Sequence, residues 1–465
     1  MSMSKREGER QSDLFVPTAE LARSPGHPFY ERLNKVLAEA GFDPFVERVC
    51  LPFYAKTNGR PSVAPGIYVR MLMVGYFEGL NSEREIDWRC ADSLSLRSFL
   101  GYDLSQKTPD HSTLCRIRQR LDLETHREIF AFALKVLAEK GLLKGKTIGI
   151  DATTMEANAA MKSIVRRDTG EGYDSFLASL AKESGIETPT RADLARIDKK
   201  RKNKASNDDW QNPHDPDAEI TKMKDGRTHL AHKVEHAVDM DTGAVMAVTI
   251  QPGAKGDTKS LPETLSAAFE NTEKVLQDPS AAKNLSDRLL TEVVGDKGYH
   301  SNDTMVLTAA TGVRSYISEP ERGRRDWEDK QNAQRATYAN RRRIKGERGK
   351  ALMRRRGEML ERTFAHTLES GAMRRACLRL RDNILKRYLV HVAGFNLSLV
   401  MRATLGVGTP RGLRGRLQAA LEAVAATLRR LLAAEGRLLD ALDRLLRPTR
   451  GQPSVTSARA FATGC

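Results

Sequence analysis

The chain has 465 residues, which is too long for one compact core and predicts two or three domains. Hydrophobic residues make up 40% and charged residues 29% of it, so the compositional extremes of disordered and membrane proteins are absent. Its 76 Lys and Arg against 60 Asp and Glu give a net charge of +16, which makes nucleic acid the favoured partner. A basic surface kept only for solubility is the alternative.

The cysteines and the N-terminus bear on the cellular compartment. The five cysteines are scattered and form no CxxC pair, so neither a disulfide framework nor a zinc site is indicated, and a reducing cytosol fits best. No apolar segment follows the N-terminal charges, and no stretch approaches the ~20 apolar residues of a membrane span. We expect a cytoplasmic, nucleoid-associated protein with a flexible N-terminus over residues 1–28.

Residues 29–140 are predicted to form a helical domain, because apolar residues recur there at three- and four-residue spacing. Asp110 or Ser112 can cap a helix with the sequence LCRIRQRL, which carries Arg116 and Arg118 on opposite faces. Such a helix could lie in a DNA groove. The alternative is an ordinary amphipathic helix whose arginines face solvent. The predicted DNA contacts of this domain are Arg60, Arg116 and Arg118.

After Gly145 the pattern changes to short β-rich runs, which we assign to a second domain over residues 145–402. MDTG is a good tight turn between the second and third runs, and LPETLSAAFENTEKVL predicts a helix before the fourth. The order is strand, β-hairpin, helix, strand, helix, strand. The predicted strands are Thr147–Thr154, Leu230–Asp239, Ala244–Pro252, Glu292–Asp296 and Val313–Ser318.

Two stretches depart from this compact pattern. An insert at about residues 158–228 contains a predicted helix, SFLASLAKESG, and a charged, turn-rich segment; such long loops are often functional, and the alternative is a solvated excursion. Residues 410–450 predict an amphipathic helical tail that dimerises or docks, and residues 451–465 are predicted to be disordered.

Residues 319–356 form the densest basic run of the chain. A surface that follows DNA phosphates is the functional interpretation, and the solvated face of a long helix is the alternative. The predicted DNA contacts in this run are Arg341, Arg342 and Arg343.

Two aspartates, one within and one at the end of an apolar strand, are suited to metal binding. Asp151 lies within TIGID, where an unpaired carboxylate is unfavourable unless a cation compensates it. Asp296 ends EVVGD, at the end of a strand where sheets open into sites. Phosphodiester cleavage needs charge stabilised on the attacking and leaving oxygens, which two metal ions can supply. Because magnesium prefers oxygen ligands, two Mg²⁺ ions, with Mn²⁺ as a substitute, are the expected cofactors.

A third acid should come from a helix after the last strand. Glu361 lies in such a helix, and Glu358 and Glu369 are alternative candidates. Because Glu358 lies on nearly the same helix face, periodicity does not separate it from Glu361. Each acid also has an ordinary explanation, as a strand-end acceptor, a turn former or an exposed partner for arginine. Together, Asp151, Asp296 and Glu361 predict a catalytic, metal-binding triad.

Two other groups were weighed as sites. HLAHKVEH places His229, His232 and His236 on one face if the segment is helical, which could bind zinc. The surrounding pattern favours a strand, on which His229 and His232 point to opposite faces, so we interpret the histidines as structural or DNA-adjacent. Asp257 is interpreted as a helix-start residue before Leu261.

At these motifs the chain resembles the insertion-sequence DDE transposases, and the likeness runs from about Phe29 to Arg402. GRPSVAPGIYVRMLMVGYFEGL and TPDHSTLCRIRQRL look like the N-terminal helical domain of that family. GIDATTMEANAA resembles its first-aspartate strand, GDKGYHS its second-aspartate motif and LERTFAHTLES its glutamate helix. SNDDWQNPHDPDAEITKMKDGRTHLAHK is similar to the insert and second strand of one branch.

The resemblance implies an α/β fold in which an RNase H-like mixed sheet is flanked by helices, preceded by an all-helical DNA-binding domain and followed by a helical tail. It implies a bacterial DNA transposase that binds terminal inverted repeats and target DNA as a homodimer and catalyses metal-dependent strand cleavage and strand transfer. The alternatives are a catalytically inactive or domesticated DNA-binding protein, and an RNase H-like nuclease without strand transfer.

The chain departs from some branches of the family around the glutamate. Gly357 and Leu368 stand where the spacing calls for Arg and Lys, so other basic residues must substitute for them. The expected substitutes are Arg362, His366, Lys386 and Arg387, and Lys297 beside Asp296 is a further predicted DNA contact.

Overall fold

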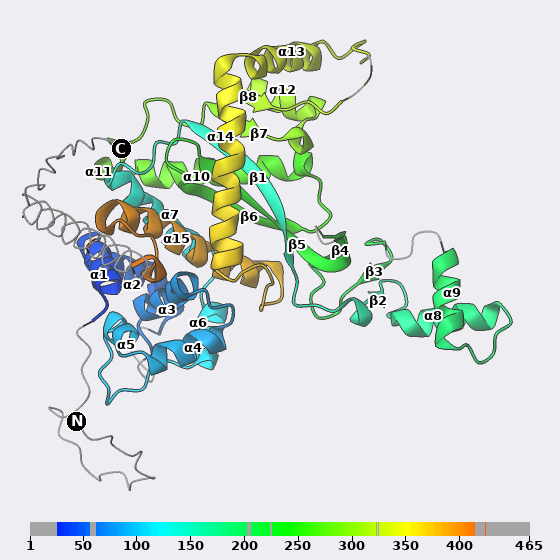
Figure 1. Ribbon diagram of the computed structural model, residues 1–465, viewed down its shortest axis with the longest axis horizontal. Coiled ribbons are helices and arrows are strands. Elements are labelled where there is room, and N and C mark those ends of the chain that lie inside the picture. The colour runs from blue at the N-terminus through cyan, green and yellow to red at the C-terminus, as the bar shows by residue number, and fades with distance from the viewer. Residues whose placement is uncertain are drawn as a thin grey trace, which may run out of the picture. The chain divides into compact units, whose positions relative to one another are not determined.

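The computed structural model describes residues 26–55, 62–201, 206–223, 226–321, 323, 325–413 and 424 (Figure 1). The chain divides into two units, Met1–Pro410 and Arg411–Cys465, and the first contains the helices and strands given below. Arg60, residues 451–465 and most of the predicted terminal segments, 1–28 and 410–450, lie outside the described residues.

The region predicted to be helical contains short helices with clear start signals. Asp110 accepts a hydrogen bond from the Thr113 amide at 2.7 Å and caps α6, while Ser82 and Glu85 form a capping box on α4. These helices belong to the same compact unit as the sheet that follows. They are α1 Pro28–Glu39, α2 Phe42–Cys50, η2 Leu51–Phe53, α3 Pro65–Glu78, α4 Glu83–Asp92, α5 Leu94–Leu100, α6 His111–Arg120 and α7 Leu123–Glu139.

The predicted strands are confirmed and pair into one mixed sheet. Its order is β4-β5-β1-β7-β8, and β6 also pairs with β5. Strand β1 is antiparallel to β5 and parallel to β7, which is parallel to β8. This sheet with its flanking helices is consistent with the expected RNase H-like domain. The strands are β1 Thr147–Glu156, β4 Glu219–Lys222, β5 Thr228–Asp239, β6 Val245–Pro252, β7 Glu292–Gly295 and β8 Arg314–Ile317.

Helices cover the sheet and connect its strands. Helix α10 packs on β5 and β6, and α14 crosses β1, β5, β7 and β8, as the yellow helix in Figure 1 shows. Helix α10 begins at Asp257, the predicted helix-start residue, ahead of the predicted apolar run from Leu261, and it contains Pro262. The elements are α10 Asp257–Leu276, α11 Pro279–Ala282, η4 Lys297–Tyr299, α12 Asn302–Ala310, α13 Gln331–Lys345, α14 Glu347–Phe364, the π-helical η5 Ala365–Ser370 and α15 Arg381–Leu405.

Helix α15 joins the N-terminal helices to the sheet. It packs on α3 and α7 on one side and on β6 on the other. Asn396 on this helix exchanges hydrogen bonds of 2.9 and 2.8 Å with the backbone of Val245 at the start of β6. The stretch Arg381–Leu413 is long and apolar enough to cross a membrane, yet most of its apolar window is buried within the protein. This burial is the pattern of a core helix.

The insert between β1 and β5 has a small core of its own. It packs around Trp210, which is 1% exposed, and the predicted helix is present as α8. Asp215 is fully buried and accepts a hydrogen bond from the Leu380 amide, so the insert is tied to the start of α15. The elements of the insert are η3 Met161–Ser163, β2 Val165–Arg166, α8 Tyr173–Glu183, α9 Arg191–Lys200 and β3 Trp210–Gln211.

Candidate active site

The two predicted aspartates lie where β1 and β7 separate. The two strands are paired in parallel only as far as Gly149 and Val294. Asp151 and Asp296 follow these last partners, so both carboxylates lie at the same end of the split. Strand β1 continues past the split because Asp151 remains paired with His236 of β5. The topology therefore places two distant acids beside the same opening.

Arg356 of α14 contacts both aspartates. Its Nη2 lies 3.0 Å from Asp151 Oδ2 and 3.9 Å from Asp296 Oδ2. Helix α14 approaches β1 closely because Gly149 has no side chain; a Cβ there would lie 3.0 Å from Leu360 Cδ1. The guanidinium thus occupies the position of a cation shared by the two carboxylates. Sequence reasoning missed this role, since Arg356 was only one member of a basic run.

The electrostatic surroundings of Asp151 are unfavourable to its charge. Burial raises the pKa of the Asp151 carboxyl, and the Arg356 guanidinium and the Ala152 amide oppose this shift. The carboxylates of Asp296 and Asp257 raise the pKa further. Negative charge at the split is therefore only partly compensated, which is the condition under which a site binds an added cation.

Asp257 is a third carboxylate near the split. It is the first residue of α10, as its interpretation as a helix-start residue predicted, and its Oδ1 lies 2.5 Å from Lys233 Nζ. A side chain at Gly298 would collide with the Asp257 carboxylate, and its Cβ would lie 3.0 Å from Asp296 Oδ1. Gly298 therefore lets the carboxylates of Asp257 and Asp296 approach each other.

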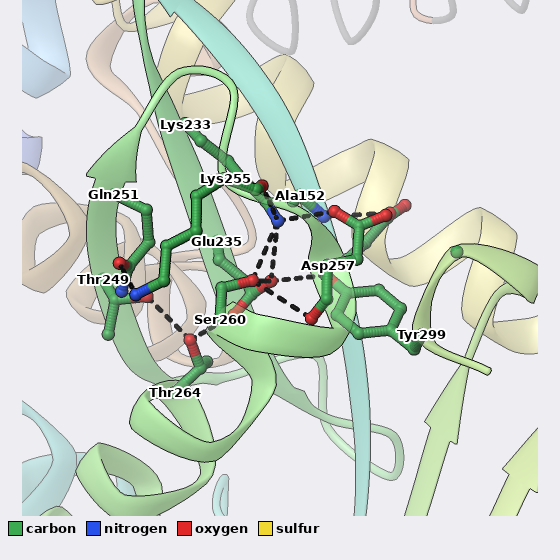
Figure 2. A network of polar contacts seen from close by, with 12 residues as sticks. Ala152, Lys233, Glu235, Thr249, Gln251, Lys255, Asp257, Ser260, Thr264 and Tyr299 are labelled. Carbon is green, nitrogen blue, oxygen red and sulfur yellow. Dashed lines mark hydrogen bonds and ion pairs between the residues drawn. The ribbon is translucent and has the colours of Figure 1, made fainter. Parts of the chain in front are cut away.

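A buried acid, Glu235, lies on β5 beneath α10 (Figure 2). Its carboxylate accepts hydrogen bonds from Ser260 Oγ at 2.8 Å, from Tyr299 Oη at 2.6 Å and from Thr264 Oγ1. Lys233 Nζ lies 3.7 Å from it and also donates to Ser260 Oγ at 2.8 Å. Sequence reasoning missed this network, although a glutamate within the predicted strand HKVEHAVD was a signal similar to that used for Asp151.

Glu361, the predicted third ligand, lies apart from the aspartates. It is exposed on α14, whereas Arg356, Leu360 and Thr363 of that helix are buried. Its rival Glu358 forms an ion pair of 2.5 Å with Arg362. Within the described ranges, no hydrogen bond or ion pair joins Glu361 to either aspartate, and no three His, Cys, Asp or Glu side chains form a metal-sized group.

The three histidines lie on β5, so the predicted strand is confirmed for them. His232 Nε2 lies 3.2 Å from the buried carboxylate of Asp215. His236 bonds to Thr363 and Tyr388 and stacks on the Phe364 ring. Burial lowers the pKa of His236 to about 3, so it is neutral at physiological pH.

Three of the predicted DNA contacts are engaged inside the fold. Arg118 is buried and pairs with Glu83. Lys386 Nζ donates to the carbonyl of Leu121 at 2.8 Å, and the buried Arg387 donates to the carbonyl of Leu72 at 2.9 Å. Lys386 and Arg387 hold α15 against the N-terminal helices, and Arg118 joins α6 to α4, which leaves all three poorly placed for a phosphate.

The other predicted DNA contacts differ in exposure. Arg341 pairs with Glu319 at 2.6 Å, and Arg343 donates to the carbonyl of Ser315 at 2.9 Å. His366 is half-buried beside the Phe395 ring, and its pKa is lowered by burial. The exposed ones are Arg116, Lys297, Arg342 and Arg362.

Comparison with known proteins supplies the family. A transposase domain (DUF772) matches residues 18–120, and a transposase DDE domain matches residues 197–393, which include Asp296 and Glu361. No curated protein and no solved structure matches the chain. The two matches lie in the order that the sequence motifs predicted and together cover more than half of the residues. The chain therefore belongs to the insertion-sequence DDE transposase family.

Proposed function

We propose that this chain is a DNA transposase that binds the terminal inverted repeats of its element as a homodimer, cleaves the strands and joins them to target DNA. The observation that carries the proposal is the meeting of Asp151 and Asp296 at one guanidinium, in a chain of the DDE transposase family. A merely structural pair of acids would not need to gather like charges at an open split of the sheet.

The residues at the split suit divalent metal ions. Carboxylate oxygens are the ligands that Mg²⁺ and Mn²⁺ prefer, and the charge of Asp151 is only partly compensated by Arg356. When bound, two such ions would stabilise charge on the attacking and leaving oxygens of a phosphodiester. Asp151 and Asp296 would hold them, with Glu361 as the third ligand by its place in the family motif.

Other residues would bind and orient DNA. Lys297 follows Asp296 directly and is exposed, so it can contact a phosphate beside the cleaved bond. Arg116 on α6 and Arg342 on α13 are exposed and suited to contacts farther along the duplex. Such contacts position the substrate without reading its sequence.

The test uses purified full-length protein and duplexes that carry the inverted repeats flanking its reading frame. Asp151→Asn, Asp296→Asn and Glu361→Gln should each lower Mg²⁺-dependent cleavage by about a thousandfold and leave end binding intact, because several kcal/mol of charge stabilisation is lost. Glu358→Gln, on the same helix, is the matched control and should retain cleavage.

Strand transfer separates this function from its rivals. Gel analysis should show repeat ends joined to a second duplex. Cleavage without joined products would favour a nuclease, and end binding without cleavage would favour a DNA-binding protein that has lost catalysis.

A further inference from the structure

We infer that Arg356 is a built-in counter-cation: its guanidinium holds Asp151 and Asp296 together in the metal-free protein and leaves them when divalent metal binds. The inference rests on the proposed function, because it takes the two aspartates as metal ligands. It adds a residue that no family motif assigned, and it names the competition that sets the metal affinity of the site.

The Arg356 guanidinium is held in place by a hydrogen bond and an ion pair. Nη2 reaches Asp151 Oδ2 at 3.0 Å, and Nε donates to the carbonyl of Ile150 at 3.2 Å. The residue is only 9% exposed. A guanidinium fixed at once to a strand carbonyl and a carboxylate is held far more firmly than a solvent-exposed ion pair.

Arg356 and a divalent ion would compete for the same oxygens. Nη2 also lies 3.9 Å from Asp296 Oδ2, so the guanidinium lies between the groups that a shared metal ion would bridge. A guanidinium and a divalent ion bound to the same carboxylates would repel each other strongly, even at the effective dielectric constant of a protein. Metal binding therefore requires Arg356 to withdraw.

Arg356 and Glu361 lie on the same helix, which links the two groups mechanically. Five residues of an α-helix turn the side-chain direction by roughly 140°, so α14 cannot present both groups to one point. In this structure Arg356 is buried and Glu361 is exposed. A rotation or shift of α14 that withdraws the guanidinium would bring Glu361 towards the aspartates.

Two features of α14 favour such a shift. Gly357 follows Arg356 directly, and a Cβ at that position would meet no neighbouring atom within 4 Å. The helix continues into the π-helical segment Ala365–Ser370, whose wider turn gives a place to absorb a change of register. The π-helical segment therefore offers a place where the end of α14 that carries both groups can change register.

The decisive experiment measures Mn²⁺ binding to the full chain without DNA, by titration calorimetry and by the electron paramagnetic resonance signal of free Mn²⁺. Arg356→Gln should bind Mn²⁺ about tenfold more tightly than wild type, because the competing charge is gone. Arg356→Lys keeps the charge and should stay within about threefold of wild type. Arg355→Gln is the matched control, since Arg355 is exposed and, among the residues that the structure describes, donates only to the carbonyl of Asp241. An unchanged or weaker affinity of Arg356→Gln would overturn the inference.

A second measurement needs no variant. Phenylglyoxal labelling followed by mass spectrometry should leave Arg356 protected in the metal-free wild type and modify it once Mn²⁺ is added. Persistent protection in Mn²⁺-loaded protein would also overturn the inference. Failure of the proposed function is distinct from both outcomes: wild type would then bind no Mn²⁺, or Asp151→Asn would leave its affinity unchanged.

Discussion

Two acids on neighbouring strands of this sheet, the buried Glu235 on β5 and the partly buried Asp151 on β1, have opposite surroundings. Glu235 is fully buried, and hydrogen bonds from three hydroxyl groups and a nearby lysine compensate its charge. Asp151 has one guanidinium and one amide, and it is opposed by the carboxylates of Asp296 and Asp257.

The difference distinguishes an acid that builds the fold from one that is held for chemistry. A fully hydrogen-bonded carboxylate needs nothing further, and its removal leaves donors without partners. A partly compensated carboxylate at an opening still attracts a cation. Glu235 is more buried than Asp151, so burial alone would have made it the stronger candidate for a site residue. The number of groups that compensate each carboxylate favours Asp151 instead.

The largest effect on stability is expected for Glu235→Ala. The change leaves the hydroxyls of Ser260, Thr264 and Tyr299 without their acceptor and the charge of Lys233 with less compensation, so the free energy of unfolding should fall by about 3–5 kcal/mol. Urea unfolding followed by circular dichroism measures it. A loss below about 1 kcal/mol, no larger than that expected for an exposed residue, would remove the contrast between the two acids.

Asp151→Asn should change the free energy of unfolding by no more than about 1 kcal/mol at pH 7, since the side chain it replaces carries a poorly compensated charge. Burial raises the pKa of Asp151 above its ordinary value of 3.8, so the folded protein holds the proton more tightly than the unfolded chain. The wild type should therefore lose stability relative to the Asn variant as pH rises from that value through the folded pKa. Denaturation curves across this range would contradict the account if the wild type gained instead.

The smallest effect is expected at Glu319, a carboxylate satisfied near the surface. Arg341 and Arg325 lower its pKa from 4.5 to about 2. Glu319→Gln should cost no more than about 1 kcal/mol at pH 7, because the pairs are partly exposed. Since the depressed pKa stabilises the fold only above the ordinary value, the difference between wild type and variant should vanish as pH falls from 4.5 towards 2. Thermal melts of both proteins at the two ends of this pH range measure the difference in stability, and a difference that persists at the low end would contradict the prediction.

The strands could be predicted because each is a short apolar run bounded by turn residues, as in β1 and β7. The apolar run of α10 begins only at Leu261, whereas the helix begins at Asp257, the predicted helix-start residue, and contains Pro262, which removes one backbone hydrogen bond. Local pattern thus predicted five strands of the main sheet, but it did not predict β4, which lies inside the predicted insert.

The contacts of the candidate site could be predicted only in part. Asp151 and Asp296 were found because acids at apolar strand ends are unusual. Helical periodicity places Arg356 on one face of α14 with Leu360 and Thr363, but it does not say what that face contacts, so the role of Arg356 could not be predicted. For the same reason periodicity could not distinguish Glu358 from Glu361, both of which lie on the exposed side.

Helix α15 has a consequence for shortened copies of this gene. Its polar side chains bond to the backbone of α3 through Arg387 and to that of β6 through Asn396. A product that stops before Arg381 would lack α15. It would therefore expose apolar surface on the N-terminal helices and on the sheet, and it would not persist as a folded protein. Premature stop codons should therefore yield material cleared by proteolysis instead of a truncated repressor competing for the repeats.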